Sequence, residues 1–235
     1  IAMPVSFLTD EQQRRYGRFA GEPSVDHLAR YFHLDDTDKA FIRSRRGDHM
    51  RLGVAVQLGA VRFLGTFLDD LTTTPVRVQA FVGKQIGISS DAKIGAYQES
   101  RWRWRHEIEI RERYGYRAFT EPMVQFRLNR WLYALSWTGT ERPSVLFDRA
   151  VAWLLANKVV LPGLSVLERA IARVRARAGE RLWQSLTSRV SQEQRYRLEA
   201  LLAVADGERR SAFDRLRDGP VLQSPAELGR AIERL

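Results

Sequence analysis

Arginine side chains recur along one predicted helix, and their spacing could serve nucleic-acid recognition. Arg169, Arg173 and Arg177 are four residues apart, so at about 100° per residue they follow one side of a helix. The forked guanidinium group can donate paired hydrogen bonds to a phosphate or to a guanine edge. Ser165 lies in the first turn, where a hydroxyl group can cap the helix or contact a phosphate. The same pattern fits a basic helix face that contacts only water, and the segment alone favours neither interpretation.

The residues around these arginines predict a helix-turn-helix unit. Apolar residues at helical spacing after Pro143 predict a supporting helix that ends near Ala156. Residues 161–163, a leucine, a proline and a glycine, predict the turn. The helix after the turn is expected to place one apolar stripe against the core: Leu167, Ile171, Val174, Ala178, Leu182 and Leu186.

A second helix-turn-helix candidate lies earlier in the chain. One helix is predicted from Val76 to Ile86, and another is expected to begin near Asp91. The expected buried stripe of this second helix is Ile94, Tyr97, Trp104 and Ile108. The candidate DNA contacts are Ser90, Lys93, Gln98, Arg101, Arg103 and Arg105. Arginines alternate with tryptophans in residues 101–105, which fits nucleic-acid contact and cation–π packing within the fold about equally well.

Residue sets for catalysis or metal binding are missing from the sequence. It has no glycine loop of the phosphate-binding type and no paired-histidine zinc motif. Asp69 and Asp70 could flank a metal, but no third carboxylate has an evident spacing to them. The absence of cysteine excludes thiol catalysis and cysteine-ligated zinc, and it fits a cytoplasmic location. We therefore expect no catalytic residue, no metal and no cofactor, which disfavours a small nuclease or another hydrolase.

The charge balance favours a polyanionic partner. The 235 residues include 38 Lys and Arg against 28 Asp and Glu, a formal net charge of +10. Nearly all the basic residues are arginines, which suit bidentate contacts with phosphate, although a coding bias would look the same. The apolar stretch from Arg51 to Leu68 is too short and too interrupted to span a membrane, so no membrane partner is expected.

The pattern of apolar residues predicts an all-α protein of two helical lobes. Helical periodicity recurs along the chain without the alternation of half-buried strands. The turn at residues 120–122 divides the lobes, giving an N-terminal DNA-binding lobe at 3–119 and a second DNA-binding lobe at 120–235, each with a helix-turn-helix-like unit. Ser191 and Gln194 predict a capping box in the second lobe. Because the last helix reaches Leu235 without a stop signal, we expect a longer parent protein.

Several separated blocks, in the same order along the chain, resemble one known family. They are residues 3–9 (MPVSFLT), 28–34 (LARYFHL), 46–49 (RGDH), 62–67 (RFLGTF), 114–117 (YGYR), 141–143 (ERP), 161–163 (LPG) and 181–183 (RLW). These blocks resemble the N-terminal region of transposases of the Tn-three family of bacterial replicative transposons.

The resemblance implies sequence-specific binding of double-stranded DNA at the terminal inverted repeats of a transposon, as the non-catalytic N-terminal part of a transposase. In that family, strand cleavage and transfer use a metal-bound acidic triad in a much later C-terminal domain. The alternative is a protein-interaction module for transposase assembly or end pairing, with self-association in the full-length protein. The salt dependence of binding distinguishes these two functions. Affinity for DNA falls steeply as the salt concentration rises, whereas affinity across an apolar protein interface changes little.

Overall fold

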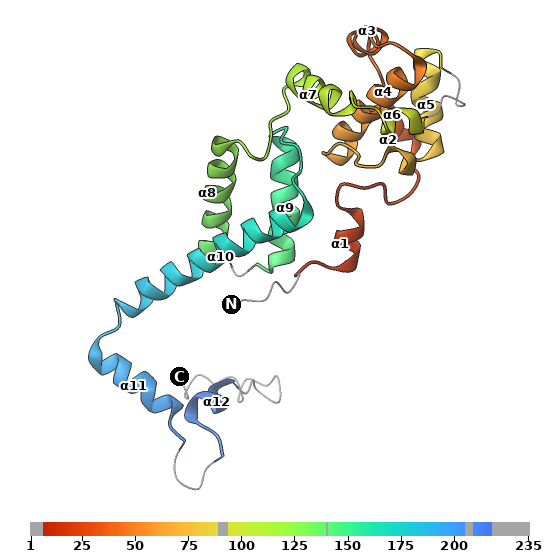
Figure 1. The fold of residues 1–235 in the computed structure, drawn as a ribbon. Coiled ribbons are helices and arrows are strands. Elements are labelled where there is room, and N and C mark those ends of the chain that lie inside the picture. Colours follow the sequence, from red (N-terminus) through yellow and green to blue (C-terminus); the bar gives the residue numbers. More distant parts are fainter. Residues whose placement is uncertain (1–6, 89–93, 140, 205–208, 218–235) are drawn as a thin grey trace. The chain divides into compact units, whose positions relative to one another are not determined.

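A computed structural model describes residues 7–88, 94–139, 141–204 and 209–217 of the chain. These residues form helices and turns, with one isolated β-bridge between Arg117 and Val159 and no named strand (Figure 1). The prediction of an all-helical chain is confirmed for this part of the protein. The chain divides into two compact units, residues 1–179 and 180–235.

The first unit contains most of the helices. Its first half holds α1 (Asp10–Arg15), α2 (Val25–Tyr31), α3 (Asp36–Arg43), α4 (Asp48–Leu64), η1 (Leu71–Thr73), α5 (Val76–Ile86), α6 (Ile94–Gln98) and α7 (Arg103–Tyr114). Its second half holds α8 (Pro122–Thr138), α9 (Pro143–Ala156) and the start of α10 (Leu164–Thr187). The second unit holds the end of α10, then α11 (Gln192–Leu202) and α12 (Ala212–Arg217).

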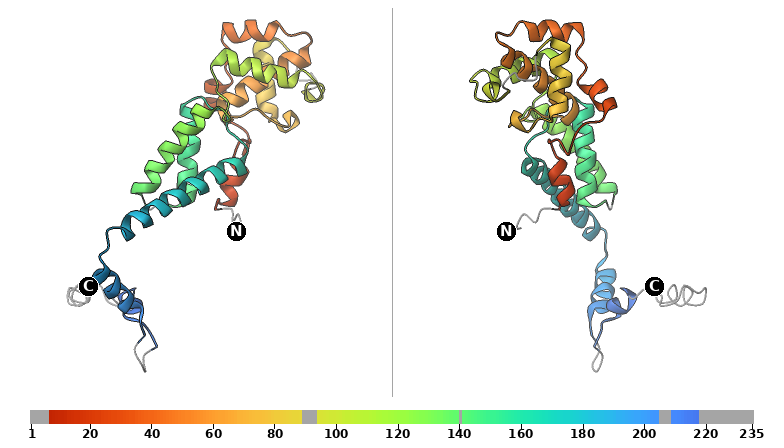
Figure 2. Two further views of the ribbon diagram at one scale, coloured as in Figure 1. Left: turned by 60° about the vertical axis from the view of Figure 1, so that its left-hand side comes forward. Right: turned by 90° about the vertical axis from the view of Figure 1, so that its right-hand side faces the viewer.

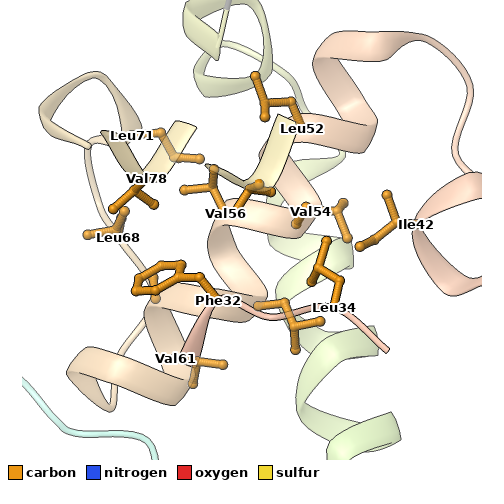
Figure 3. Packing of buried hydrophobic residues seen from close by; sticks show 14 of the residues in the cluster. Phe32, Leu34, Ile42, Leu52, Val54, Val56, Val61, Leu68, Leu71 and Val78 are labelled. Atoms are coloured by element: carbon orange, nitrogen blue, oxygen red, sulfur yellow. The ribbon is translucent and has the colours of Figure 1, made fainter. Parts of the chain in front are cut away.

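Helix α4 is the centre of the first hydrophobic cluster. Every residue from Leu52 to Val61 is buried, because α2, α3, α5, α6 and α7 all pack against this helix. Figure 3 shows side chains of α4 beside Phe32 and Ile42 of the neighbouring segments. Glycine allows these segments to approach closely, since a Cβ atom on Gly53 would lie 2.1 Å from the Tyr97 ring.

A buried ion pair joins three helices of this cluster. The two terminal guanidinium nitrogens of Arg62 in α4 donate to the Asp38 carboxylate in α3, at 2.9 Å each. The Tyr114 hydroxyl at the end of α7 donates to the same carboxylate at 2.7 Å. Asp38 also belongs to the capping box of its own helix, so one side chain both caps α3 and anchors it to α4 and α7.

The second hydrophobic cluster lies among α8, α9 and the first turns of α10. Its buried side chains include Leu128 and Leu132 of α8, Leu154 of α9, and Leu167 and Ile171 of α10. Helices α8 and α9 pack against each other and lie side by side in the left view of Figure 2. The N-terminal half of α10 is thereby anchored through one face and keeps the opposite face free of the core.

The N-terminal segment packs against the turn that precedes α10. The Tyr16 hydroxyl donates to the Pro162 carbonyl at 2.8 Å, and the Tyr16 ring lies 5.3 Å from the Phe147 ring. Gln12 in α1 donates to the Asp148 carboxylate in α9 at 2.8 Å. These contacts join residues more than 130 positions apart in the sequence.

Backbone hydrogen bonds connect the two hydrophobic clusters of the first unit. Arg117 donates to the Lys158 carbonyl at 2.8 Å and accepts from Val160 at 2.9 Å. Leu161 donates to the carbonyl of Gly65, just after α4, at 2.8 Å. The turn before α10 is therefore attached to both halves of this unit, which fixes where α10 begins. The predicted lobe boundary at residues 119 and 120 stays a prediction, although the two clusters lie mostly on either side of it.

Candidate nucleic-acid interface

The arginines of α10 lie on a helix whose other side is held by the core. Leu167 and Ile171 are fully buried, and Ala178 is nearly so. Arg169, at about 200° around the helix from Leu167, lies almost opposite these anchors and is exposed. Because the buried side fixes the rotation of the helix, the direction in which its arginines project is fixed as well.

None of these three arginines has a carboxylate partner within the described part of the chain. Arg173 and Arg177 are exposed and have no hydrogen bond or ion pair there, while the Arg169 Nε donates to the Ser165 carbonyl one turn earlier, at 3.0 Å. Ser165 itself is exposed in the first turn of α10. Arg175, which is not among the predicted contacts, is also exposed and lies on the other flank of the helix. Because Arg175 alternates with Arg173 and Arg177 in the sequence, this spacing could have identified it as a candidate contact.

The predicted buried stripe of α10 is wrong at its C-terminal end. Leu182 and Leu186 are 39% and 48% exposed, and Trp183 is 69% exposed. The first compact unit ends at Gly179, so the second cluster that buries Leu167 does not continue to these residues. The apolar stripe has helical spacing along the whole helix, but the neighbouring helices that bury it contact only its N-terminal half.

The other helix-turn-helix candidate corresponds to α5, α6 and the residues between them. Ser90 and Lys93 lie outside the described residues. Helix α6 has five residues and ends at Gln98, whereas the prediction had one helix continuing to at least Ile108. The helix-turn-helix assignments of this segment and of α9 with α10 stay predictions.

Gln98 and Arg103 contact the loop that precedes η1. The Gln98 amide accepts from the Leu71 backbone at 3.0 Å and donates to the Asp69 carbonyl at 2.8 Å. Arg103 donates to the same carbonyl at 2.7 Å and lies 3.4 Å from Glu107. Both side chains therefore hold residues 69–71 against α6 and α7, a structural task that their polarity alone did not reveal.

The arginines beside Trp102 form cation–π contacts within the fold. The guanidinium carbons of Arg101 and Arg105 lie 5.3 and 5.6 Å from the centre of the Trp102 ring. Arg105 also lies 3.3 Å from the Glu109 carboxylate. Both arginines are exposed, so their outer nitrogens remain accessible to a partner.

The predicted burial of Trp104 is wrong, since this side chain is 71% exposed. Helix α6 ends at Gln98 and α7 begins at Arg103, and the intervening turn changes the phase of the buried face. His106 and Ile110 supply the buried side of α7 instead. The break was hidden in the sequence because none of residues 99–102 is a glycine or a proline.

An open groove of about 1110 Å³ lies between the N-terminal segment, the residues after α4 and the start of α10. Its lining combines Arg14 and Arg18 with Asp10, Asp69 and Asp70. Because charges of both signs line this groove, it does not resemble a phosphate site, and the exposed face of α10 is the better candidate for a polyanion.

No group of three or more histidine, aspartate or glutamate side chains in the described part of the chain could hold a metal ion. None of the described helices is both long enough and apolar enough to cross a membrane.

Known proteins resemble this chain over most of its length. The family described as "Domain of unknown function (DUF4158)" matches residues 7–174. The transposase for transposon gamma-delta of Escherichia coli (strain K12) is 46% identical over 233 residues, which are 99% of this chain and 23% of the relative. The transposase for transposon Tn1546 of Enterococcus faecium is 27% identical over 100% of this chain and 24% of the relative. The transposase for transposon Tn21 of Escherichia coli is 32% identical over 90% of this chain and 21% of the relative.

The chain thus spans about a quarter of the length of the curated relatives that it matches. The DUF4158 match covers most of the chain, and the match to the gamma-delta transposase covers nearly all of it. The chain therefore belongs to the DUF4158 family and represents one region of the Tn-three family of transposases.

Proposed function

We propose that this chain binds double-stranded DNA at the terminal inverted repeats of a transposon, as a non-catalytic region of a transposase. The observation that carries the proposal is the exposed arginine face of α10. Arg173 and Arg177 project from an anchored helix and have no carboxylate partner in the described residues. Strand cleavage and transfer would belong to parts of the relatives that this chain does not span.

The geometry of α10 supports duplex DNA as the ligand. A helix with a buried back and an arginine front can enter a major groove, where guanidinium groups reach phosphates and base edges. Ser165 and the first backbone N–H groups of α10 lie at the same end as Arg169, where a phosphate would be favoured. The formal net charge of +10 supplies long-range attraction to the duplex.

The test begins with selection of preferred duplexes from a random library on the purified chain. Affinities for the selected duplex and for a scrambled duplex of equal composition are then compared by gel shift at several salt concentrations. Preference for the selected duplex is expected, and its sequence should match the ends of transposons of this family. Equal affinity for both duplexes would contradict sequence-specific binding.

Substitution then tests whether α10 carries the binding. Arg173→Ala should weaken duplex binding, whereas Arg197→Ala serves as a matched control. Arg197→Ala removes the same formal charge, but Arg197 lies on α11 and pairs with Glu193 at 2.6 Å. This control should therefore lose less affinity for the duplex than Arg173→Ala. Equal losses in the two variants would indicate nonspecific attraction by net charge. Absence of any DNA binding by the parent chain would favour the protein-interaction alternative.

A further inference from the structure

Helix α8 is apolar on two opposite faces. One face packs into the second hydrophobic cluster through Val124, Leu128 and Leu132, which are at most 1% exposed. At about 100° per residue, the face turned away from this cluster carries a different set. We call this set the outward face of α8: Met123, Phe126, Arg130, Tyr133 and Trp137.

The outward face exposes large apolar side chains. Phe126 is 60% exposed, Met123 is 56% exposed and Trp137 is 38% exposed. The Tyr133 and Trp137 rings are stacked, with their centres 6.0 Å apart. A surface helix ordinarily has polar residues opposite its buried stripe, so several large apolar side chains exposed on that face indicate an interaction site.

The spacing of the outward face is that of a helix–helix seam. Successive members are alternately three and four residues apart, which is the heptad spacing of positions that pack knobs into holes against another helix. Methionine, aromatic residues and arginine are also the types enriched in protein interfaces. Both features indicate a helical protein partner.

Charge defines the partner further. Helix α8 contains no aspartate, glutamate or lysine, and neither Arg127 nor Arg130 has a hydrogen bond or an ion pair in the described residues. Arg130 occupies the middle of the seam, where an apolar partner would leave its charge unpaired. Two copies of this face packed antiparallel about Arg130 would oppose like charges, which disfavours self-pairing.

We propose that the outward face of α8 docks a helix of a protein partner that presents an apolar seam with a carboxylate opposite Arg130. This surface is separate from the arginine face of α10 and does not depend on DNA binding. Duplex DNA fits it less well, because Met123 and Phe126 offer no hydrogen-bond donor to phosphates and protein–DNA interfaces are more polar than this face.

The test uses two synthetic helical peptides with the same leucine seam, one with glutamate and one with lysine at its central position. Each is titrated into the whole chain and followed by fluorescence anisotropy. The glutamate peptide should bind at least about tenfold more tightly than the lysine peptide, as expected for an opposite against a like charge. Arg130→Glu should reverse that preference. A reversed preference between the two peptides distinguishes a change of charge from loss of the folded face, which would weaken or equalise binding of both.

Two further variants test the apolar part of the seam. Phe126→Ala should weaken binding of the glutamate peptide, whereas Val76→Ala should not, because Val76 is 73% exposed on α5, outside the outward face. Equal affinity of the parent chain for both peptides, or failure to bind either, would overturn the proposal. If the parent chain binds neither peptide and Phe126→Ala loses duplex binding, the outward face of α8 contacts DNA, and the proposal is overturned. We expect Phe126→Ala to bind the duplex as the parent chain does. Failure of the peptide test would then leave the proposal of DNA binding untouched.

Discussion

At the scale of single residues, Asp38 shows how one side chain connects distant elements. Its side chain is 1% exposed, and such burial by itself raises the pKa of a carboxyl group. Hydrogen bonds from Arg62 and Tyr114, together with the charge of Arg62, outweigh the burial and lower the pKa of Asp38 below its ordinary value. The folded state therefore favours the ionised carboxylate.

Asp38→Asn should lower the free energy of unfolding by about 3 kcal/mol, because it leaves the half-buried Arg62 charge without its partner. The lowered pKa also sets the direction of the pH effect. The stability that ionised Asp38 contributes is present above the unfolded-state pKa of about 4 and is lost as the pH falls through the folded-state value. Urea unfolding at neutral and acidic pH measures both effects.

The matched control for this prediction is Asp36→Asn on the same helix. Asp36 is fully exposed and lies 3.9 Å from Lys39, so its neutralisation should change stability little. In Asp38→Asn, the acid-dependent loss of stability should be smaller than in the parent. If the two variants unfold alike, the buried ion pair does not stabilise the contact of α3 with α4 and α7.

Gly53→Ala should destabilise the protein by about 1–3 kcal/mol, because the added methyl group overlaps the buried Tyr97 ring. Gly95→Ala is the matched control, and it should stabilise the protein. Gly95 lies in α6 with nothing within 4 Å of an added Cβ atom, so alanine should improve helix stability by about 0.5–1 kcal/mol. Thermal unfolding monitored by circular dichroism compares the two. A neutral Gly53→Ala variant would contradict the close packing of α4 with α6.

At the scale of elements, the position of an arginine along α10 should decide its effect on DNA binding. Arg169 lies near the start of the helix, where side chains of a groove-inserted helix reach base edges. Arg169→Ala should cost about 1–3 kcal/mol on the recognised duplex and much less on a scrambled one. Competition gel shifts with both duplexes give the two affinities.

Arg177, about two turns further along α10, should contact phosphates as the helix axis diverges from the groove. Arg177→Ala should weaken binding to both duplexes equally and reduce the slope of log affinity against log salt by about one unit. If neither arginine variant changes DNA affinity in a protein that melts like the parent, α10 does not face DNA. The next residues to test would then be Arg101 and Arg105.

At the scale of the whole molecule, residues 1–179 should fold without the second unit. Both hydrophobic clusters lie within residues 8–171, and the DUF4158 match ends at residue 174. A chain that ends at Gly179 should therefore melt cooperatively, close to the melting temperature of the full chain. A chain that ends at Ala156 is the control, and it should melt far lower because it loses Leu167 and Ile171. Non-cooperative melting of the first chain would contradict the division of the molecule after Gly179.

The sequence by itself determined the helical class and many helix ends, because these depend on neighbours a few residues away. The capping box of Ser191 with Gln194 and the end of α5 at Ile86 were both predicted and are confirmed. The arginine positions on α10 also followed from local spacing, since Leu167 and Ile171 fix the buried side. Such features need only helical periodicity and short-range hydrogen bonds.

Only the tertiary structure decided which apolar stripes are covered and which polar groups are already engaged. Leu182 and Leu186 continue a regular stripe but lie beyond the cluster that buries Leu167, so they remain exposed. Gln98 and Arg103 looked free for DNA, yet they bind the Asp69 carbonyl, about 30 residues earlier in the chain. Periodicity describes one helix at a time, whereas burial and pairing depend on segments that only folding brings together.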